Sequence, residues 1–223
     1  MASGATRKAL SGTELFAGLP DDALDRIADH GVERTFKKGQ ILFSAGDPGD
    51  ALYVLLEGSV KGFVTSDDGS ELIVGLMEAP VVFGEVAVGD GGARSAGIEV
   101  TDPARVLVIS RPQFFAALGE HTGLVESYIG MLTAMIRRLQ ERTESLVFLD
   151  LQGRVARVLL EMSNGEDALD LAVTQGDLAA MVGGSRPSVN QVLKAFEGRG
   201  YITLQGKRLE IVEREKLGRL SAI

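Results

Sequence analysis

The sequence predicts a mixed α+β fold that joins an N-terminal β-roll, a long helix and a C-terminal winged helix-turn-helix. Short runs of strand-forming residues, separated by glycines, fill the stretch from Val32 to Ser110. Apolar residues then recur at heptad spacing from Val125 to Leu146, and two short helical patterns flank Gly183-Gly184. The predicted domains are a β-roll domain at 1–120, a long helix with a hinge at 121–149, and a helix-turn-helix domain at 150–223.

The composition excludes several classes of protein. The 223 residues include no cysteine, which excludes disulfides, thiolate zinc sites and cysteine-ligated iron–sulfur clusters. The two histidines, His30 and His121, are too few for an ordinary metal centre, so we expect neither a metal nor a covalently bound cofactor. The chain has no apolar run of membrane-spanning length and no signal-peptide pattern at Met1. We therefore expect a cytoplasmic protein with no membrane partner.

The charge is unevenly distributed. The net charge is −8, yet residues 169–223 carry eight basic and six acidic side chains, whereas residues 1–168 carry 15 basic and 25 acidic ones. This asymmetry places any contact with nucleic acid at the C-terminal end.

The first elements are helical. Residues 1–10 show no periodic pattern and are predicted to be a mobile terminus. A short helix should begin after Pro20, with Asp21 and Asp22 in its first turn, and end at Gly31.

Seven or eight short strands are expected next, over about 80 residues. Dense turn signals separate them, including the cluster Gly46–Asp50, the pair Glu57-Gly58 and the hairpin signal at Asp67-Asp68-Gly69. Regular short strands of this kind are typical of a β-barrel or β-roll.

The pattern then becomes helical, with a short helix opened by Pro112 and a long one after it. The long helix carries a seam at a and d positions, formed by Val125, Ile129, Leu132, Ile136, Leu139, Thr143 and Leu146. The seam could simply pack on the barrel, but strict heptad spacing favours a parallel coiled coil and hence a homodimer through residues 123–147. Thr143 is its one polar member and therefore a candidate for a functional role.

A hinge is expected at Leu149–Gly153 and a further helix at Arg154–Met162.

Thr174 and Asp177 form a capping-box pattern, Gly183-Gly184 a tight turn, and Ser185 the cap of a second short helix. These features predict a helix-turn-helix, and residues 201–212 read as a hairpin wing with a basic tip. A solvated αα-hairpin is the alternative, but the donor-rich face favours DNA binding. The candidate DNA contacts are Thr174, Gln175, Ser185, Arg186, Ser188, Asn190, Gln191, Lys194 and Lys207.

A glycine-rich loop is the candidate ligand site. Gly84-Glu85-Val86 precedes Arg94-Ser95, with three glycines between them. Glycine permits close approach of a ligand to the backbone, and arginine can make two parallel hydrogen bonds to a phosphate. A surface turn with a Glu85–Arg94 ion pair accounts for the pattern equally well.

Together these motifs resemble those of the cyclic-AMP receptor (Crp/Fnr) family of bacterial transcription regulators, from about Leu15 to Val212. The segments that carry the resemblance are Phe83–Glu85 with Arg94–Ala96, Gly46–Gly58, Phe148–Ala156, Thr174–Ala179 and Gly184–Val189.

The resemblance implies a cyclic-nucleotide-binding fold in residues 1–120 and a role for each site residue. Glu85 would bind the ribose hydroxyl, and Arg94 with Ser95 the cyclic phosphate. Arg138 would tie the long helix to Glu85, and Thr143 would contact the base. The effector would be cAMP first, with cGMP or another nucleotide as alternatives. The partners would be double-stranded DNA, a second copy of the chain and RNA polymerase.

Three departures from the family pattern bear on specificity. The segment from Arg138 to Phe148 is about one helical turn shorter than in familiar members, which leaves the alignment of Thr143 open. Pro187 stands where the family usually has glutamate, and Gln191 stands where the best-known members have arginine.

Two other functions remain alternatives. The same architecture could respond to another small molecule or to none. An enzyme on a cupin-like barrel is remote, because it would need clustered metal ligands, and a haem sensor is disfavoured by the same lack of ligands. We expect a regulator and not an enzyme.

Overall fold

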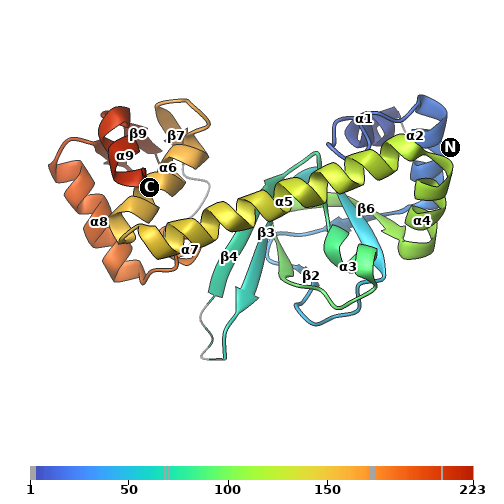
Figure 1. Cartoon of the computed structure of the whole chain (residues 1–223), viewed down its shortest axis with the longest axis horizontal. Coiled ribbons are helices and arrows are strands. Elements are labelled where there is room, and N and C mark those ends of the chain that lie inside the picture. Colours follow the sequence, from blue (N-terminus) through green and yellow to red (C-terminus); the bar gives the residue numbers. More distant parts are fainter. Residues whose placement is uncertain (1–3, 68, 70, 171–173, 207, 223) are drawn as a thin grey trace. The chain divides into compact units, whose positions relative to one another are not determined.

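The computed structural model describes residues 4–67, 69, 71–170, 174–206 and 208–222. They form two compact units, Met1–Ile136 and Arg137–Ile223, and the boundary falls inside the long helix α5 (Thr122–Phe148) (Figure 1). The heptad seam therefore lies on one continuous helix, as predicted.

The N-terminal unit is built around an antiparallel sheet in the order β1-β6-β3-β4, with β2 also paired to β6 and β5 to β3. Its strands are β1 (Val32–Phe36), β2 (Ile41–Phe43), β3 (Ala51–Thr65), β4 (Glu71–Glu78), β5 (Val81–Phe83) and β6 (Gly97–Ser110). Its helices, besides the first part of α5, are α1 (Gly4–Ser11), α2 (Asp21–His30), α3 (Glu85–Asp90) and α4 (Arg111–Glu120).

The central strand β3 is buried on both faces, because its side chains alternate between two cores. Leu52, Val54 and Leu56 pack with the helices of the unit, whereas Leu55 and Val60 belong to the interior of the roll. The roll is thus a sheet covered by helices on one side and filled by its own side chains on the other.

The β-roll has fewer and longer strands than the sequence predicted. The turn signal at Glu57-Gly58 lies inside the 15-residue β3, where the register with β6 shifts. Gly58 has φ +87°, and a Cβ there would lie 2.2 Å from the Pro103 carbonyl oxygen. The glycine makes a bulge in a continuous strand, which local sequence cannot distinguish from a turn.

Two local predictions for the N-terminal unit were wrong. The segment predicted to be a mobile terminus contains α1, in which Leu10 and Thr6 are buried and the Thr6 hydroxyl donates to Glu33 Oε1. Unlike α7 (Gln175–Val182), which is equally short, α1 has no acidic residue in its first turn, so little in the sequence marks its start. The short helix α3, which follows Gly84, was also missed.

The C-terminal unit is a winged helix-turn-helix. Its helices are the end of α5, α6 (Leu151–Ser163), α7 (Gln175–Val182), α8 (Arg186–Gly198) and α9 (Arg214–Ser221). Its sheet has the order β7-β9-β8, from β7 (Ala168–Asp170), β8 (Ile202–Gln205) and β9 (Arg208–Ile211). β7 and α9 were not predicted, and Leu217 of α9 is fully buried in the core of this unit.

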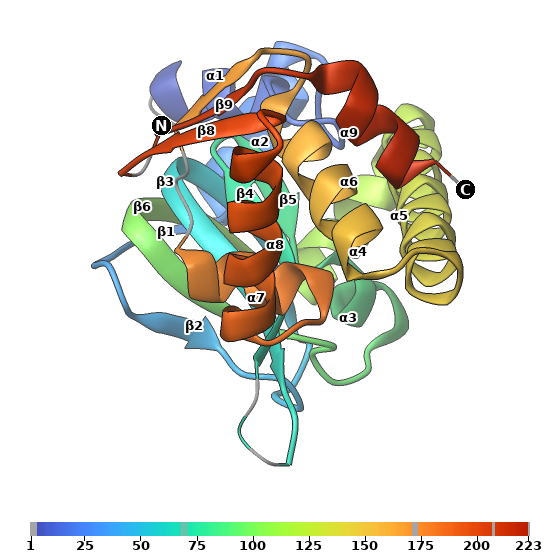
Figure 2. The same cartoon turned by 90° about the vertical axis from the view of Figure 1, so that its left-hand side faces the viewer.

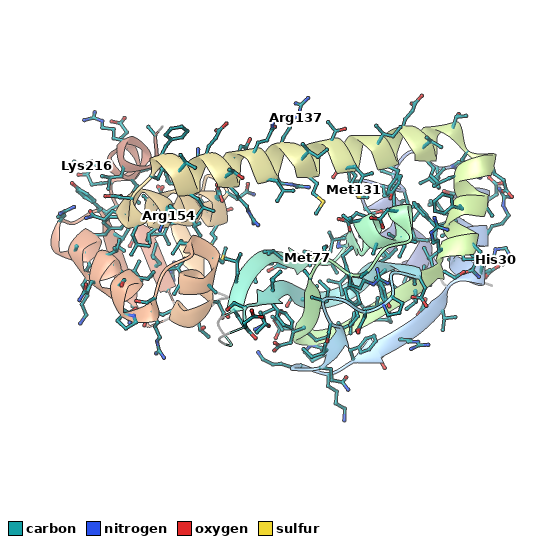
Figure 3. All side chains as sticks on the ribbon, turned by 60° about the horizontal axis from the view of Figure 1, so that its bottom comes forward. His30, Met77, Met131, Arg137, Arg154 and Lys216 are labelled. Carbon is teal, nitrogen blue, oxygen red and sulfur yellow. The ribbon has the colours of Figure 1, made fainter. Side chains whose placement is uncertain are left out.

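Two arginines of α6 hold the end of α5 to the helix-turn-helix. Arg154 donates from Nη1 to the Leu149 carbonyl and from Nε to the Val182 carbonyl, both at 2.9 Å (Figure 3). Arg157 donates to Ser145 Oγ. Among the described residues, no helix combines the length and apolar character needed to cross a membrane.

Candidate ligand-binding and DNA-binding sites

Arg94 is the most unusual side chain of the β-roll. The residue is only 4% exposed. Its guanidinium donates to the Gly84 carbonyl at 3.1 Å and to the Ala51 carbonyl at 2.8 Å. The guanidinium carbon lies 4.4 Å from the ring centre of Phe43 and 5.1 Å from that of Tyr53, so aromatic faces support the cation.

The positive charge of Arg94 is poorly balanced. Arg94 forms an ion pair with Asp50 at 3.9 Å, and the Asp50 side chain is 84% exposed. The buried Nε has no hydrogen-bond partner among the described residues. A buried cation that carries an unused donor is a site for an anion, because an unpaired buried donor is costly.

Glycines allow the backbone to approach this arginine. Gly84 has φ +80°, and a Cβ there would lie 2.6 Å from Arg94 Nη1. Gly49 would place a Cβ 2.5 Å from the Gly92 carbonyl oxygen. Both positions therefore require glycine.

Glu85 is the first residue of α3, immediately after Gly84. The Tyr128 hydroxyl of α5 donates to its backbone carbonyl at 2.7 Å. Burial, together with the carboxylates of Glu85 and Asp90, raises the pKa of Tyr128, so the hydroxyl stays protonated and can donate. Gly89 makes room for this contact, since a Cβ there would lie 2.1 Å from the Tyr128 oxygen.

The remaining residues of the predicted ligand site are placed as follows. Ser95 is exposed and Val86 is half-buried. Arg138 and Thr143 are exposed residues of α5 in the C-terminal unit, and the Thr143 hydroxyl donates to the Leu139 carbonyl at 2.9 Å.

Sequence reasoning missed the residues around Arg94. Phe43, Tyr53 and Phe83 form an aromatic cluster in which Tyr53 and Phe83 stack at 5.4 Å. The residues lie on three different strands: the pairing of β3 with β5 places Tyr53 opposite Phe83, whereas Phe43 lies on β2, which pairs with β6. In the sequence, the only sign of this cluster was the presence of single aromatic residues within predicted strands, and such residues are typical of an ordinary hydrophobic core.

The helix-turn-helix forms with the predicted caps. Thr174 Oγ1 accepts from the Asp177 N–H at 3.1 Å, and the Thr174 N–H donates to Asp177 Oδ2 at 2.8 Å. Gly183 ends α7 with φ +63°, and Ser185 Oγ accepts from the Ser188 N–H at 3.2 Å.

The second helix, α8, packs against α7 (Figure 2). Its outer face is polar. Its inner face is buried and consists of Val189, Val192, Leu193 and Phe196, as predicted. The exposed candidate DNA contacts are Thr174, Gln175, Ser185, Arg186, Gln191 and Lys194. Ser188 and Asn190 are half-buried, and the Asn190 Oδ1 atom is covered. Lys207, at the wing tip, lies outside the described residues.

The fold and these two sites define a regulator that joins a β-roll to a winged helix-turn-helix. A family model described as "Cyclic nucleotide-binding domain" matches residues 33–121, and one described as "Crp-like helix-turn-helix domain" matches residues 153–220.

Whole-chain relatives agree with this combination. The CRP-like cAMP-activated global transcriptional regulator of Mycobacterium tuberculosis is 29% identical over 92% of this chain and 95% of its own length. The regulator Vfr of Pseudomonas aeruginosa is 28% identical over 84% of this chain and 92% of its own length.

Solved structures agree as well. The catabolite activator protein of Thermus thermophilus superposes with a TM-score of 0.57 at 27% identity, over 93% of this chain and 98% of that one. FixK2 of Bradyrhizobium japonicum superposes with a TM-score of 0.77 at 20% identity, over 86% and 98%. The chain belongs to the Crp family of transcription regulators.

Proposed function

We propose that this regulator is a homodimer that binds a cyclic nucleotide, with cAMP as the first candidate, in the β-roll and a palindromic DNA site through α8. The carrying observation is the buried Arg94, whose Nε has no partner among the described residues and whose ion-pair partner, Asp50, lies in solvent.

A cyclic phosphate suits this position chemically. Its single negative charge would neutralise Arg94, and the adjacent Ser95 hydroxyl would supply a further donor. Glu85 would accept from the ribose 2′-hydroxyl. The curated relatives are named as cAMP-activated, which supports this choice of effector.

The base would be contacted from α5. Thr143 is the candidate for this contact, on this chain or on the partner copy, and Arg138 would tie the long helix to Glu85. The exposed apolar stripe of α5 supports the dimer, because Ile136 and Leu139 are 58% and 54% exposed and would be covered by a second α5.

DNA would be read by Arg186 and Gln191, whose side chains suit guanine and adenine respectively. Lys194 and Lys207 would contact phosphates. RNA polymerase is the expected protein partner, and the cytoplasm is the expected location.

Isothermal titration calorimetry with cAMP, cGMP and other cyclic nucleotides tests the effector. We expect saturable binding, strongest for cAMP, and tighter DNA binding in its presence. If no cyclic nucleotide binds the folded protein, the roll responds to another small molecule or to none.

A further inference from the structure

A second cavity lies in the N-terminal unit, between α2 and α4, which are neighbours in the fold (Figure 1). Its volume is about 340 Å³. Ala23 of α2 and Ala116 and Ala117 of α4 line it, and such short side chains leave space between the two helices. Its apolar wall also includes Phe16, Ile27 and Phe114.

The polar groups of this cavity include Arg26 and both histidines of the chain, His30 and His121. Arg26 Nη1 donates to Asp22 at 2.7 Å, while Nη2 lies 3.4 Å from His121 Nε2. The imidazole is 20% exposed, and Glu120 Oε2 is 4.0 Å from its Nε2. Within the described part of the chain, the Nη2 edge of Arg26 therefore makes a long contact with an imidazole, and the Arg26 side chain is 49% exposed.

We propose that this cavity binds a small carboxylate with an apolar tail. The tail would occupy the space beside the alanines, and the carboxylate would take the Nη2 edge of Arg26, replacing the long imidazole contact with a charge-assisted bond. Asp22 neutralises one edge of Arg26 but leaves the other to the ligand. A cavity of this volume holds roughly ten water-sized groups, so a chain the size of octanoate fits.

The cavity connects to the nucleotide site through direct contacts. Phe114, which lines it, packs edge-to-face on Tyr128 at 5.2 Å, and Tyr128 donates to Glu85. Arg111, at the start of α4, donates to the Val88 carbonyl of α3 at 2.9 Å. A ligand that shifts α4 would therefore also shift α3, which begins with Glu85. This coupling to the nucleotide site rests on the proposed function, whereas binding of the ligand to the cavity does not.

The test is calorimetry on the nucleotide-free full-length protein with octanoate, n-octanol and octylammonium, which share one tail. We expect octanoate to bind most tightly and Arg26→Gln to weaken it about tenfold, the effect of losing one charge-assisted bond. Lys38→Gln, which removes an exposed charge elsewhere in the unit, should leave binding unchanged. Ala117→Phe should fill the cavity and abolish binding, with a thermal melt to verify the fold.

Three outcomes would overturn the proposal: no binding of octanoate, equal binding of all three probes, or preference for octylammonium. Insensitivity to Arg26→Gln would also overturn it. A separate titration of cAMP with and without octanoate tests the coupling. Equal cAMP affinity there removes the coupling alone, and absence of cAMP binding counts only against the proposed function.

Discussion

Arg94 is the residue on which the proposed ligand site rests. The fold surrounds its cation with carbonyl oxygens and aromatic faces, and its ion-pair partner is exposed. We expect Arg94→Ala to weaken binding of the cyclic nucleotide by about 2–5 kcal/mol, because a buried charged contact is lost. Calorimetry with cAMP measures this directly.

The control for this prediction is Lys38→Ala, which removes an exposed cation from the same unit. Arg94→Lys should restore part of the affinity, since it keeps the charge and loses the planar donors. Unchanged affinity in a folded Arg94→Ala protein would show that the phosphate binds elsewhere.

Glu33 links α1 to the sheet in a pH-dependent manner. The Thr6 hydroxyl, and after it the Arg105 guanidinium, hold the pKa of Glu33 below its ordinary value of 4.5. A lowered folded-state pKa stabilises the protein above the unfolded-state pKa, and this stabilisation is lost as the pH falls through the folded-state pKa. We expect Glu33→Gln to lower the urea midpoint at pH 7, by an amount that shrinks toward pH 3.

The exposed carboxylate Glu14 provides the comparison, since Glu14→Gln should change the midpoint little at either pH. An equal loss in Glu33→Gln at both pH values would mean that packing, and not the ionised carboxylate, accounts for the effect.

At the scale of elements, α5 is the clearest case of exposed apolar surface. We expect Ile136→Asp to convert a dimer to a monomer, because it would bury facing carboxylates in an apolar seam. Light scattering measures the mass. The exposed Arg137→Asp serves as the control, since position 137 lies outside the a and d seam and its side chain projects from the helix (Figure 3). A dimeric Ile136→Asp protein would exclude the coiled coil.

Substitutions of the exposed side chains of α8 should impair DNA binding in two different ways. Arg186→Ala should cost about 1–3 kcal/mol and relax preference at one base pair per half-site. Lys194→Ala should weaken binding to all DNA sequences alike. It should also reduce the salt dependence of binding, because one phosphate contact, and the counterion release that accompanies it, is lost. Titrations of both variants at several salt concentrations distinguish the two, and unaltered base preference in Arg186→Ala would contradict the assignment.

Helices with caps were predictable from sequence, whereas sheet details were not. Thr174, Gly183 and Ser185 act within a few residues of their own position, so the sequence contains all that determines α7 and α8. Gly58 acts against Pro103, far along the chain, and therefore misled the strand assignment. The same reasoning applies to the candidate ligand site. The glycine-rich motif indicated Arg94, but it could not indicate the aromatic rings of other strands that pack against its guanidinium.

At the scale of the whole molecule, the two-fold symmetry of the proposed dimer would fix the form of the DNA target. The proposed dimer would present two α8 helices about 34 Å apart, so the selected sites should be inverted repeats with half-sites one helical turn apart. Selecting bound DNA from a pool of random duplexes, with and without cAMP, identifies the target sequence. A non-palindromic site would contradict the homodimeric arrangement.

The long pairing of β3 with β6 has a consequence for how the chain folds. Ala51 pairs with Ser110 and Phe63 with Gly97, so the central ladder closes only after the whole intervening segment has been synthesised. Contacts so distant in sequence slow folding, because loop closure must precede the pairing. In the C-terminal unit, by contrast, β8 pairs with β9, its neighbour in sequence, and the most distant strand pair of that unit, Ala168 with Glu210, is closer in sequence than Ala51 with Ser110. The β-roll should therefore be the slower unit to fold and, on the ribosome, the one whose unpaired β3 strand stays open to aggregation the longest.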